Sequence, residues 1–421
     1  MHVTGPTGLR KVLTDRNSGL YLSGVVVSGF GSTAMSLVAG MWVKELTGSS
    51  SVAALATFCV WLPTLFGPAV GVLADRTRRR TLLIATNVAM AVLLLPLLAV
   101  RSADGLWILF AVMIVYGIST VLQDAAEAAL VTAAVPAELR GDFNGLRMTA
   151  NEGMKLVAPL AGAALFAARG GFSVALLDAA TFLAAAAAFA CIRVSEPPVG
   201  RPEGESWAAQ TVEGARYLWR HPLLRRLVLA GGSVMLLSGL SAAAVYAVVD
   251  SGLHRDAAFV GVLYTFQGIG SMLGGLTAGA LMRRMSEPAF SAAGIAVFSL
   301  GVVLRAISST GLALAGSVLI GVGLPCGLIS ALTAVQRETP ENLLGRVAAT
   351  ANTFLFGPSV VAQGVGAGLV AVVDHRLLLW AVGAGGVATS VWCLAGSRRQ
   401  PLRPAVPEED VRQASASPSD G

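Results

Sequence analysis

The chain has 421 residues, of which 55% are hydrophobic and only 13% are charged, and its mean hydropathy is +0.70. Soluble globular proteins are about 25% charged, so this composition excludes a soluble domain and predicts a protein of the lipid bilayer. The basic residues behind the net charge of +6 fall in short connectors rather than on one face, which argues against nucleic acid as a partner.

Apolar stretches recur along the whole chain. A helix needs about 20 apolar residues to cross a hydrocarbon core of about 30 Å. The sequence predicts twelve such spans, at residues 19–43, 50–73, 81–100, 106–133, 147–168, 171–192, 224–249, 257–282, 289–308, 311–334, 347–373 and 376–396. We therefore expect an all-α membrane protein with twelve transmembrane helices.

The basic residues predict how the chain is oriented. Most of them, Arg147 included, fall in the connectors and tails on the side of the amino terminus, whereas Lys44 and Arg305 are among the few assigned to the opposite side. By the positive-inside rule, both termini should be cytoplasmic. Arginine far outnumbers lysine and alanine is abundant, which is typical of high-GC bacterial genomes and favours a bacterial inner membrane.

The two halves of the chain resemble each other. GPAVGVLADR at 67–76 aligns with GLTAGALMRR at 275–284, and PAELRG at 136–141 aligns with PENLLG at 340–345. Similar segments after corresponding spans indicate a duplicated six-helix unit, with chance similarity of Gly/Ala-rich helices as the alternative. We expect an N-terminal bundle over 1–195, a cytoplasmic linker with a short interfacial helix over 196–222, a C-terminal bundle over 223–397 and a disordered tail over 398–421.

Few ionisable residues lie within the predicted spans. Because a charge inside the bilayer costs about 2.5–3.5 kcal/mol on insertion scales, each is a functional candidate. They are Asp124, Glu127, Glu152, Lys155 and Asp178. Asp124 and Glu127 share a helical face and are the first candidates for proton coupling, with a structural ion network or a solvated helix end as alternatives. Asp178 is assigned mainly to interhelical hydrogen bonding, with proton handling as a second role.

The sequence shows no arrangement of residues typical of an enzyme active site. The four cysteines stand alone in apolar runs, the four histidines lie outside the spans, and no phosphate-binding GxxxxGK[ST] loop occurs. We therefore expect no catalytic residues, no metal site and no cofactor, and a proton gradient as the energy source.

The connector GVLADRTRRRTLL, after the second span, resembles the signature connector of the major facilitator superfamily, as do the paired halves and the central linker. The resemblance implies the major facilitator fold and places Gly71, Asp75, Arg76 and Arg79 in a gate that locks the cytoplasmic ends of the two halves. A basic loop that only sets orientation is the alternative. The stretches WVKELTGSS, VQRETPENLLGR and EGARYLWRHPLLRR further resemble the twelve-helix macrolide and enterobactin exporters, a branch of drug:proton antiporters.

The fifth span carries Pro159 and Gly162 in LVAPLAGAAL, which resembles the helix-five bend of the superfamily's drug antiporters; a packing kink is the alternative. The expected function is export of a small amphipathic molecule, such as a drug, antibiotic or siderophore, by proton antiport with alternating access. A proton-coupled uptake symporter of a small metabolite and a non-transporting membrane sensor remain the alternatives. The expected partners are the substrate and the lipid bilayer, and we expect a monomer.

Overall fold

The computed structural model describes residues 6–66, 77–136, 139–194 and 207–397, which form helices joined by short turns. Ten of the described helices are long and apolar enough to cross a membrane. Two shorter apolar helices, Ser50–Phe66 and Leu156–Arg169, lie where the second and fifth spans are predicted. The all-α membrane fold is confirmed, and the ten long and two shorter helices agree with the predicted twelve.

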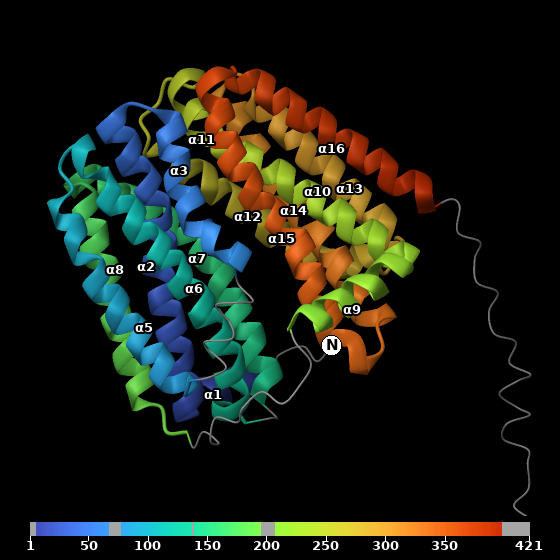
Figure 1. Cartoon of the computed structure of the whole chain (residues 1–421), viewed down its shortest axis with the longest axis horizontal. Helices are drawn as coiled ribbons and strands as arrows, with labels where there is room; N and C mark the ends of the chain where they lie inside the picture. Colours follow the sequence, from blue (N-terminus) through green and yellow to red (C-terminus); the bar gives the residue numbers. More distant parts are fainter. Residues whose placement is uncertain (1–5, 67–76, 137–138, 195–206, 398–421) are drawn as a thin grey trace, which may run out of the picture.

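The helices form two bundles that lie side by side (Figure 1). The first bundle contains α2 (Arg16–Thr47), α3 (Ser50–Trp61) with η1 (Leu62–Phe66), α5 (Arg79–Leu93) with η2 (Leu95–Ala99), α6 (Leu106–Ala134), α7 (Arg140–Arg169) and α8 (Gly171–Cys191). A short helix, α1 (Pro6–Thr14), precedes α2, and the turn η3 (Ala103–Gly105) precedes α6.

The second bundle begins after α9 (Trp207–Arg220), a helix in the stretch where a short interfacial helix is predicted. It contains α10 (Pro222–Ala243) with α11 (Val245–Ala247) and the π-helical turn η5 (Val248–Gly252), α12 (Phe259–Met282), α13 (Glu287–Arg305), α14 (Thr310–Glu338), α15 (Glu341–Val372) and α16 (His375–Ser397). The predicted tail, 398–421, lies outside the described residues.

The two ends of the molecule differ. We call the end that carries α1 and α9 the base, and the opposite end, which carries α11, the top. Figure 1 shows the bundles converging at the top and diverging toward the base. Helix α7 packs against α12, and α3 packs against α15, across the seam between the bundles. One apolar cluster contains Val38 and Trp42 of α2 together with Tyr246 and Val249 of the second bundle, so the top shares a single core.

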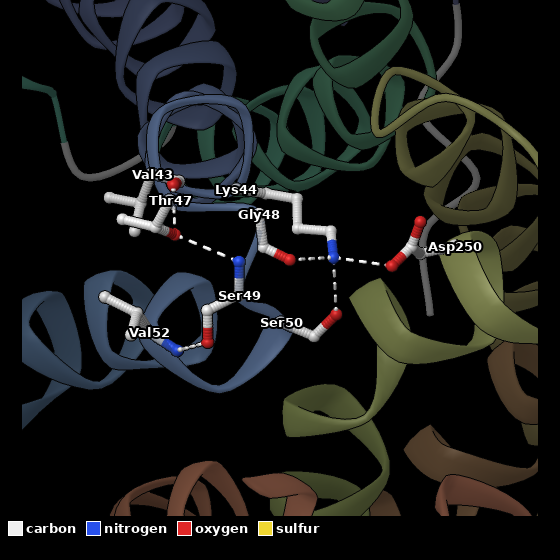
Figure 2. Close-up of polar contacts among 8 residues, drawn as sticks. All are labelled: Val43, Lys44, Thr47, Gly48, Ser49, Ser50, Val52 and Asp250. Carbon is white, nitrogen blue, oxygen red and sulfur yellow. Dashed lines mark hydrogen bonds and ion pairs between the residues drawn. The ribbon is translucent and has the colours of Figure 1, made fainter. Parts of the chain in front are cut away.

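A tight turn at the top joins α2 to α3 (Figure 2). Gly48 ends α2 with a φ of 68°, a left-handed conformation that glycine adopts without strain, and its N–H donates to the carbonyl of Lys44. Ser49 then begins α3 by accepting a hydrogen bond from the N–H of Val52 at 3.3 Å. The turn places the Lys44 side chain beside the second bundle.

Candidate functional site

A polar cavity of about 180 Å³ lies within the first bundle, between α2, α5, α6, α7 and α8. Apolar walls such as Met90 and Phe182 contribute, but most of the lining can form hydrogen bonds. The polar lining consists of Ser28, Ser32, Tyr116, Ser119, Thr120, Gln123, Asp124, Glu127 and Asn151. Small hydroxyls and amides surround the two carboxylates that the sequence indicated as the first coupling candidates.

The two carboxylates of α6 have different surroundings. Glu127 forms an ion pair with Arg147 of α7, with 3.6 Å between Oε2 and Nη1, and its side chain is 14% exposed. Asp124 lines the cavity, is exposed there, and makes no hydrogen bond or ion pair with the residues that the structure describes. Glu127 is therefore held in place, whereas Asp124 is available to a ligand or a proton.

Arg147 lies in a helix and not in a connector, so that assignment was wrong: α7 already begins at Arg140. The polar start of this helix is anchored by Phe143, which is fully buried and packs edge-on against Tyr21, with 5.4 Å between ring centroids. The Tyr21 hydroxyl in turn donates to the backbone carbonyl of Glu127 at 3.0 Å. One buried aromatic contact therefore brings α7 and its arginine to the carboxylate.

Asp178 of α8 is completely buried and connects helices, the role to which the sequence mainly assigned it. The Tyr116 hydroxyl of α6 donates to its Oδ2 at 2.8 Å, and Thr181 donates to its Oδ1 at 3.2 Å. Helix α2 passes close by at Gly31, where an added Cβ would collide with Thr181 and Asp178. Since Tyr116 also lines the cavity, its hydroxyl links the cavity to Asp178.

Pro159 and Gly162 lie on packing surfaces of α7, which continues as one helix through the proline. A Cβ on Gly162 would lie 2.9 Å from the Cβ of Ala34 in α2. On the other side of the seam, a Cβ on Gly261 of α12 would lie 2.9 Å from the carbonyl oxygen of Pro159. These residues allow α7 to approach both bundles closely, the kind of role that the packing alternative describes.

Several predicted site residues lie outside what the structure describes. Gly71, Asp75 and Arg76 of the signature connector fall in 67–76, and Arg79 is the first residue of α5. Glu152 and Lys155 belong to α7, but their side chains lie outside the described part of the chain. The gate and the second ionic pair therefore remain predictions.

Arg305 is a further site residue, one that the sequence does not single out. It ends α13, inside the predicted span 289–308, and it is only 3% exposed. Its guanidinium donates to Oγ of Ser317 at 2.8 Å and to Oε1 of Gln267 at 3.3 Å, and its Nε has no acceptor among the described residues. These acceptors on α14 and α12 draw the side chain back into the bundle. The second bundle thus contains a buried cation, while the carboxylates that line the polar cavity belong to the first.

Polar bonds connect the bundles along the seam. Lys44 of α2 forms an ion pair with Asp250 of η5, with 2.6 Å between Nζ and Oδ2 (Figure 2). Nearby, the Tyr246 hydroxyl donates to the Leu37 carbonyl at 3.2 Å, and the Ser51 hydroxyl donates to the Ala367 carbonyl. These three bonds lie at the top.

The sequence profile of the Major Facilitator Superfamily matches residues 21–363. The chain belongs to this superfamily. Membership agrees with the resemblance of the GVLADRTRRRTLL connector and with the two bundles of the structure. It also establishes the broad class, a multi-pass membrane transporter, while the substrate is not specified by the superfamily.

Two curated relatives are exporters by name. The enterobactin exporter EntS of Salmonella typhi is 27% identical over 219 residues, which cover 51% of this chain and 50% of that protein. Macrolide efflux protein A of Streptococcus pyogenes is 28% identical over 147 residues, which cover 34% of this chain and 36% of that protein. The chain thus spans about half the length of the first relative and about a third of the second.

Solved structures show the same fold at lower identity. A bacterial homologue of the iron transporter ferroportin, in an inward-facing state, matches 91% of this chain and 99% of its own, with a TM-score of 0.70 and 15% identity. The nucleoside transporter NupG matches 92% of this chain and all of its own, with a TM-score of 0.68 and 14% identity. The major facilitator fold is confirmed over nearly the whole chain.

The residues around the cavity could have been found in the sequence. Tyr116, Thr120, Gln123 and Glu127 are spaced by four, three and four residues, so they form one polar stripe on an otherwise apolar helix. Ser28 and Ser32 repeat the pattern on α2. In a membrane helix such a stripe indicates the side that faces a polar interior.

Proposed function

We propose that this transporter exports a small amphipathic molecule, such as a drug, an antibiotic or a siderophore, across the bacterial inner membrane in exchange for protons. In this proposal the base faces the cytoplasm, and both termini are cytoplasmic. Export, rather than uptake, is supported by the two named relatives. Proton coupling is supported by a single structural observation: the exposed Asp124 carboxylate in a polar cavity, with no bonding partner among the described residues.

The three carboxylates take different roles in this proposal. Glu127 is fixed by Arg147, and Asp178 accepts hydrogen bonds from Tyr116 and Thr181, so a proton on either would disturb packed contacts. A proton on Asp124 disturbs none of the described contacts. Asp124 therefore exchanges its proton with least reorganisation, and we assign the coupling role to it.

The size of the cavity limits what it can hold. Pockets for drug-sized ligands measure about 300–1,000 Å³, and this cavity measures about 180 Å³. It can accept a polar group of the substrate beside Asp124, while the apolar body of the substrate lies between the two bundles. A cationic group on the substrate and a proton on Asp124 would then exclude each other, because each neutralises the same carboxylate. That exclusion is the coupling step of an antiporter.

Alternating access is supported by where the bundles are joined. The three top bonds and the shared apolar core hold the top closed. The bundles diverge toward the base (Figure 1), so the arrangement corresponds to a transporter that loads its substrate from the base. Opening the top and closing the base would release the substrate on the other side.

The test is accumulation of ethidium, erythromycin and enterobactin in efflux-deficient bacteria that express the chain, with and without a protonophore. We expect lower accumulation of at least one compound, abolished by the protonophore and lost in the Asp124→Asn variant. The matched control is Asp104→Asn, which changes an exposed carboxylate in the top turn η3. The expression levels of the variants are compared by immunoblot and matched before accumulation is measured.

The possible results separate the parts of the proposal. Raised accumulation that needs an intact gradient would identify an uptake symporter. Export that resists the protonophore would exclude proton coupling, and full export by Asp124→Asn would move the coupling role to another group. Unchanged accumulation of all three compounds would contradict export of this substrate class.

A further inference from the structure

A basic pocket of about 700 Å³ lies at the base of the first bundle, outside the polar cavity. It is lined by Arg16 of α2, Arg80 of α5 and Arg193, which follows α8, together with 190–192 and Val194. Three arginines from three separate segments thus line one pocket. No carboxylate is among the described residues that line it.

The positions of the arginines are set by the end of α8. The last carbonyls of a helix carry partial negative charge, and here Arg80 donates from Nε to the Phe189 carbonyl at 3.1 Å and from Nη2 to the Ala190 carbonyl. Arg16 donates to the Cys191 carbonyl at 3.4 Å. These bonds cover the carbonyls that would otherwise repel an anion.

The backbone beyond α8 is held as well. Asn17 donates from Nδ2 to the carbonyl of Arg193 at 2.8 Å and accepts at Oδ1 from its N–H at 3.0 Å. The nearby carboxylate of Asp15 is turned away, since it accepts hydrogen bonds from the N–H and the hydroxyl of Ser18. The pocket therefore has a fixed basic wall without a carboxylate from Asp15 in its lining.

The flank above the pocket faces lipid. Helices α5 and α8 lie on the side of the first bundle that is away from the second bundle (Figure 1). Large apolar side chains are exposed there, among them Val88 and Val92 of α5 and Leu183 of α8. A membrane-facing apolar surface directly above a basic pocket matches a molecule with acyl chains and an anionic head.

We propose that this pocket binds the headgroup of an anionic phospholipid, with its acyl chains along α5 and α8. A guanidinium forms paired hydrogen bonds to phosphate oxygens, and Arg16 and Arg193 are the residues whose exposed side chains can do so. Basic pockets between helices at a membrane surface are suited to such headgroups. The site anchors the peripheral pair α5 and α8 to the bilayer while the bundles move.

The proposal is tested by native mass spectrometry of the full chain in detergent, titrated with phosphatidylglycerol, phosphatidylcholine or inorganic phosphate. We expect tight binding of phosphatidylglycerol that weakens about twenty-five-fold in the Arg16→Gln/Arg193→Gln variant, at about five-fold for each charge removed. The control is Arg283→Gln/Arg284→Gln, which removes two exposed arginines at the base of α12 and should leave the affinity unchanged.

Each other result counts against the proposal. If the affinity for phosphatidylglycerol fell equally in the pocket variant and in the control, the lipid would be attracted to any basic surface and not to this pocket. Binding of phosphatidylcholine with equal affinity would exclude recognition of the anionic charge, and displacement of the lipid by millimolar inorganic phosphate would identify a site for soluble anions. If the double variant unfolds, Arg193→Gln alone, which changes an exposed side chain, should still weaken lipid binding about five-fold.

Discussion

Removing the ion pair between Lys44 and Asp250 should shift the transporter toward a state with an open top. Lys44 is nearly buried, with 11% of its side chain exposed, whereas Asp250 is 54% exposed. Lys44 also donates to the Gly48 carbonyl at 2.7 Å and to the Ser50 hydroxyl at 3.1 Å, and both acceptors belong to the first bundle (Figure 2). Only the bond to Asp250 crosses the seam, so only that bond should affect opening.

The size of the effect follows from the exposure of the pair. Exposed ion pairs contribute about 0.2–1 kcal/mol because water and salt screen the charges. Since Lys44 is nearly buried and the pair is short, at 2.6 Å, we expect a coupling at the upper end, about 1 kcal/mol. This corresponds to about a five-fold change in the ratio of open to closed top.

A double-mutant cycle measures this coupling. Spin labels on cysteines at Ser102 and Gly311, two exposed positions at the top of different bundles, report the open fraction by pulsed electron spin resonance in nanodiscs. The labels are introduced into a variant in which the four native cysteines have been replaced. Lys44→Gln, Asp250→Asn and the double variant are compared. A coupling near zero would refute the reasoning.

A control variant removes the same kind of bond, a charged hydrogen bond at the top, at a position where the bond does not cross the seam. Arg376 at the top donates to the Ser308 hydroxyl at 2.6 Å, and both residues belong to the second bundle. Arg376→Gln therefore removes a charged hydrogen bond that does not cross the seam. The open fraction should not change in this variant.

Three further predictions concern packing and the linker helix. Gly31→Ala should destabilise the first bundle by about 1–3 kcal/mol, because the added methyl group would collide with Asp178, and detergent-solubilised protein should unfold at a lower temperature. Tyr116→Phe should lower the same temperature, since it removes a donor to a buried carboxylate, at a cost of about 1–3 kcal/mol. Glu213→Gln should speed proteolysis within α9, because the ion pair with Arg346 attaches α9 to α15, and the cost should be below about 1 kcal/mol.

Matched variants identify the cause in the first two cases. Gly153→Ala adds a methyl group on α7 where nothing lies within 4 Å, and it should not lower stability. Thr353→Val is the control for Tyr116→Phe. It removes an exposed hydroxyl hydrogen bond within α15, and it should leave the unfolding temperature unchanged. If Gly153→Ala and Gly31→Ala behaved alike, close packing at Asp178 would not be the reason.

The spans could be predicted because the bilayer imposes one strong rule. Backbone groups must be satisfied within each segment, so an apolar run of sufficient length predicts a helix whatever its neighbours are. The prediction of α6 at 106–133 agrees with Leu106–Ala134 for this reason. The start of α7 was missed because its polar residues resemble a connector, and only the burial of Phe143 against Tyr21 shows that they continue the helix.

Long-range partners could not be predicted in the same way. Lys44 and Asp250 lie far apart in the sequence, and each alone resembles an ordinary charge at the end of a span. Arg305 also resembles a charge at the end of a span. The apolar run before it does not reveal that its guanidinium donates to Ser317 and Gln267. The candidates Asp124 and Glu127 could be named from their residue type and spacing, but only the pairing with Arg147 separates their surroundings.

The seam at the top is weak enough to open. Among the described residues, three polar bonds cross it at the top, from Lys44, Tyr246 and Ser51, and each net contribution should be about 1 kcal/mol, since water replaces the partner when the top opens. Their total, about 3 kcal/mol, is less than the roughly 5.5 kcal/mol that takes a two-state equilibrium from 1:99 to 99:1. The apolar core that the two bundles share at the top adds to these bonds, so a proton on Asp124 and a substrate must together offset both contributions to open the top. A seam built from many buried ion pairs would have fixed one state, and the short polar bonds found here are consistent with a transporter that must leave both states within reach.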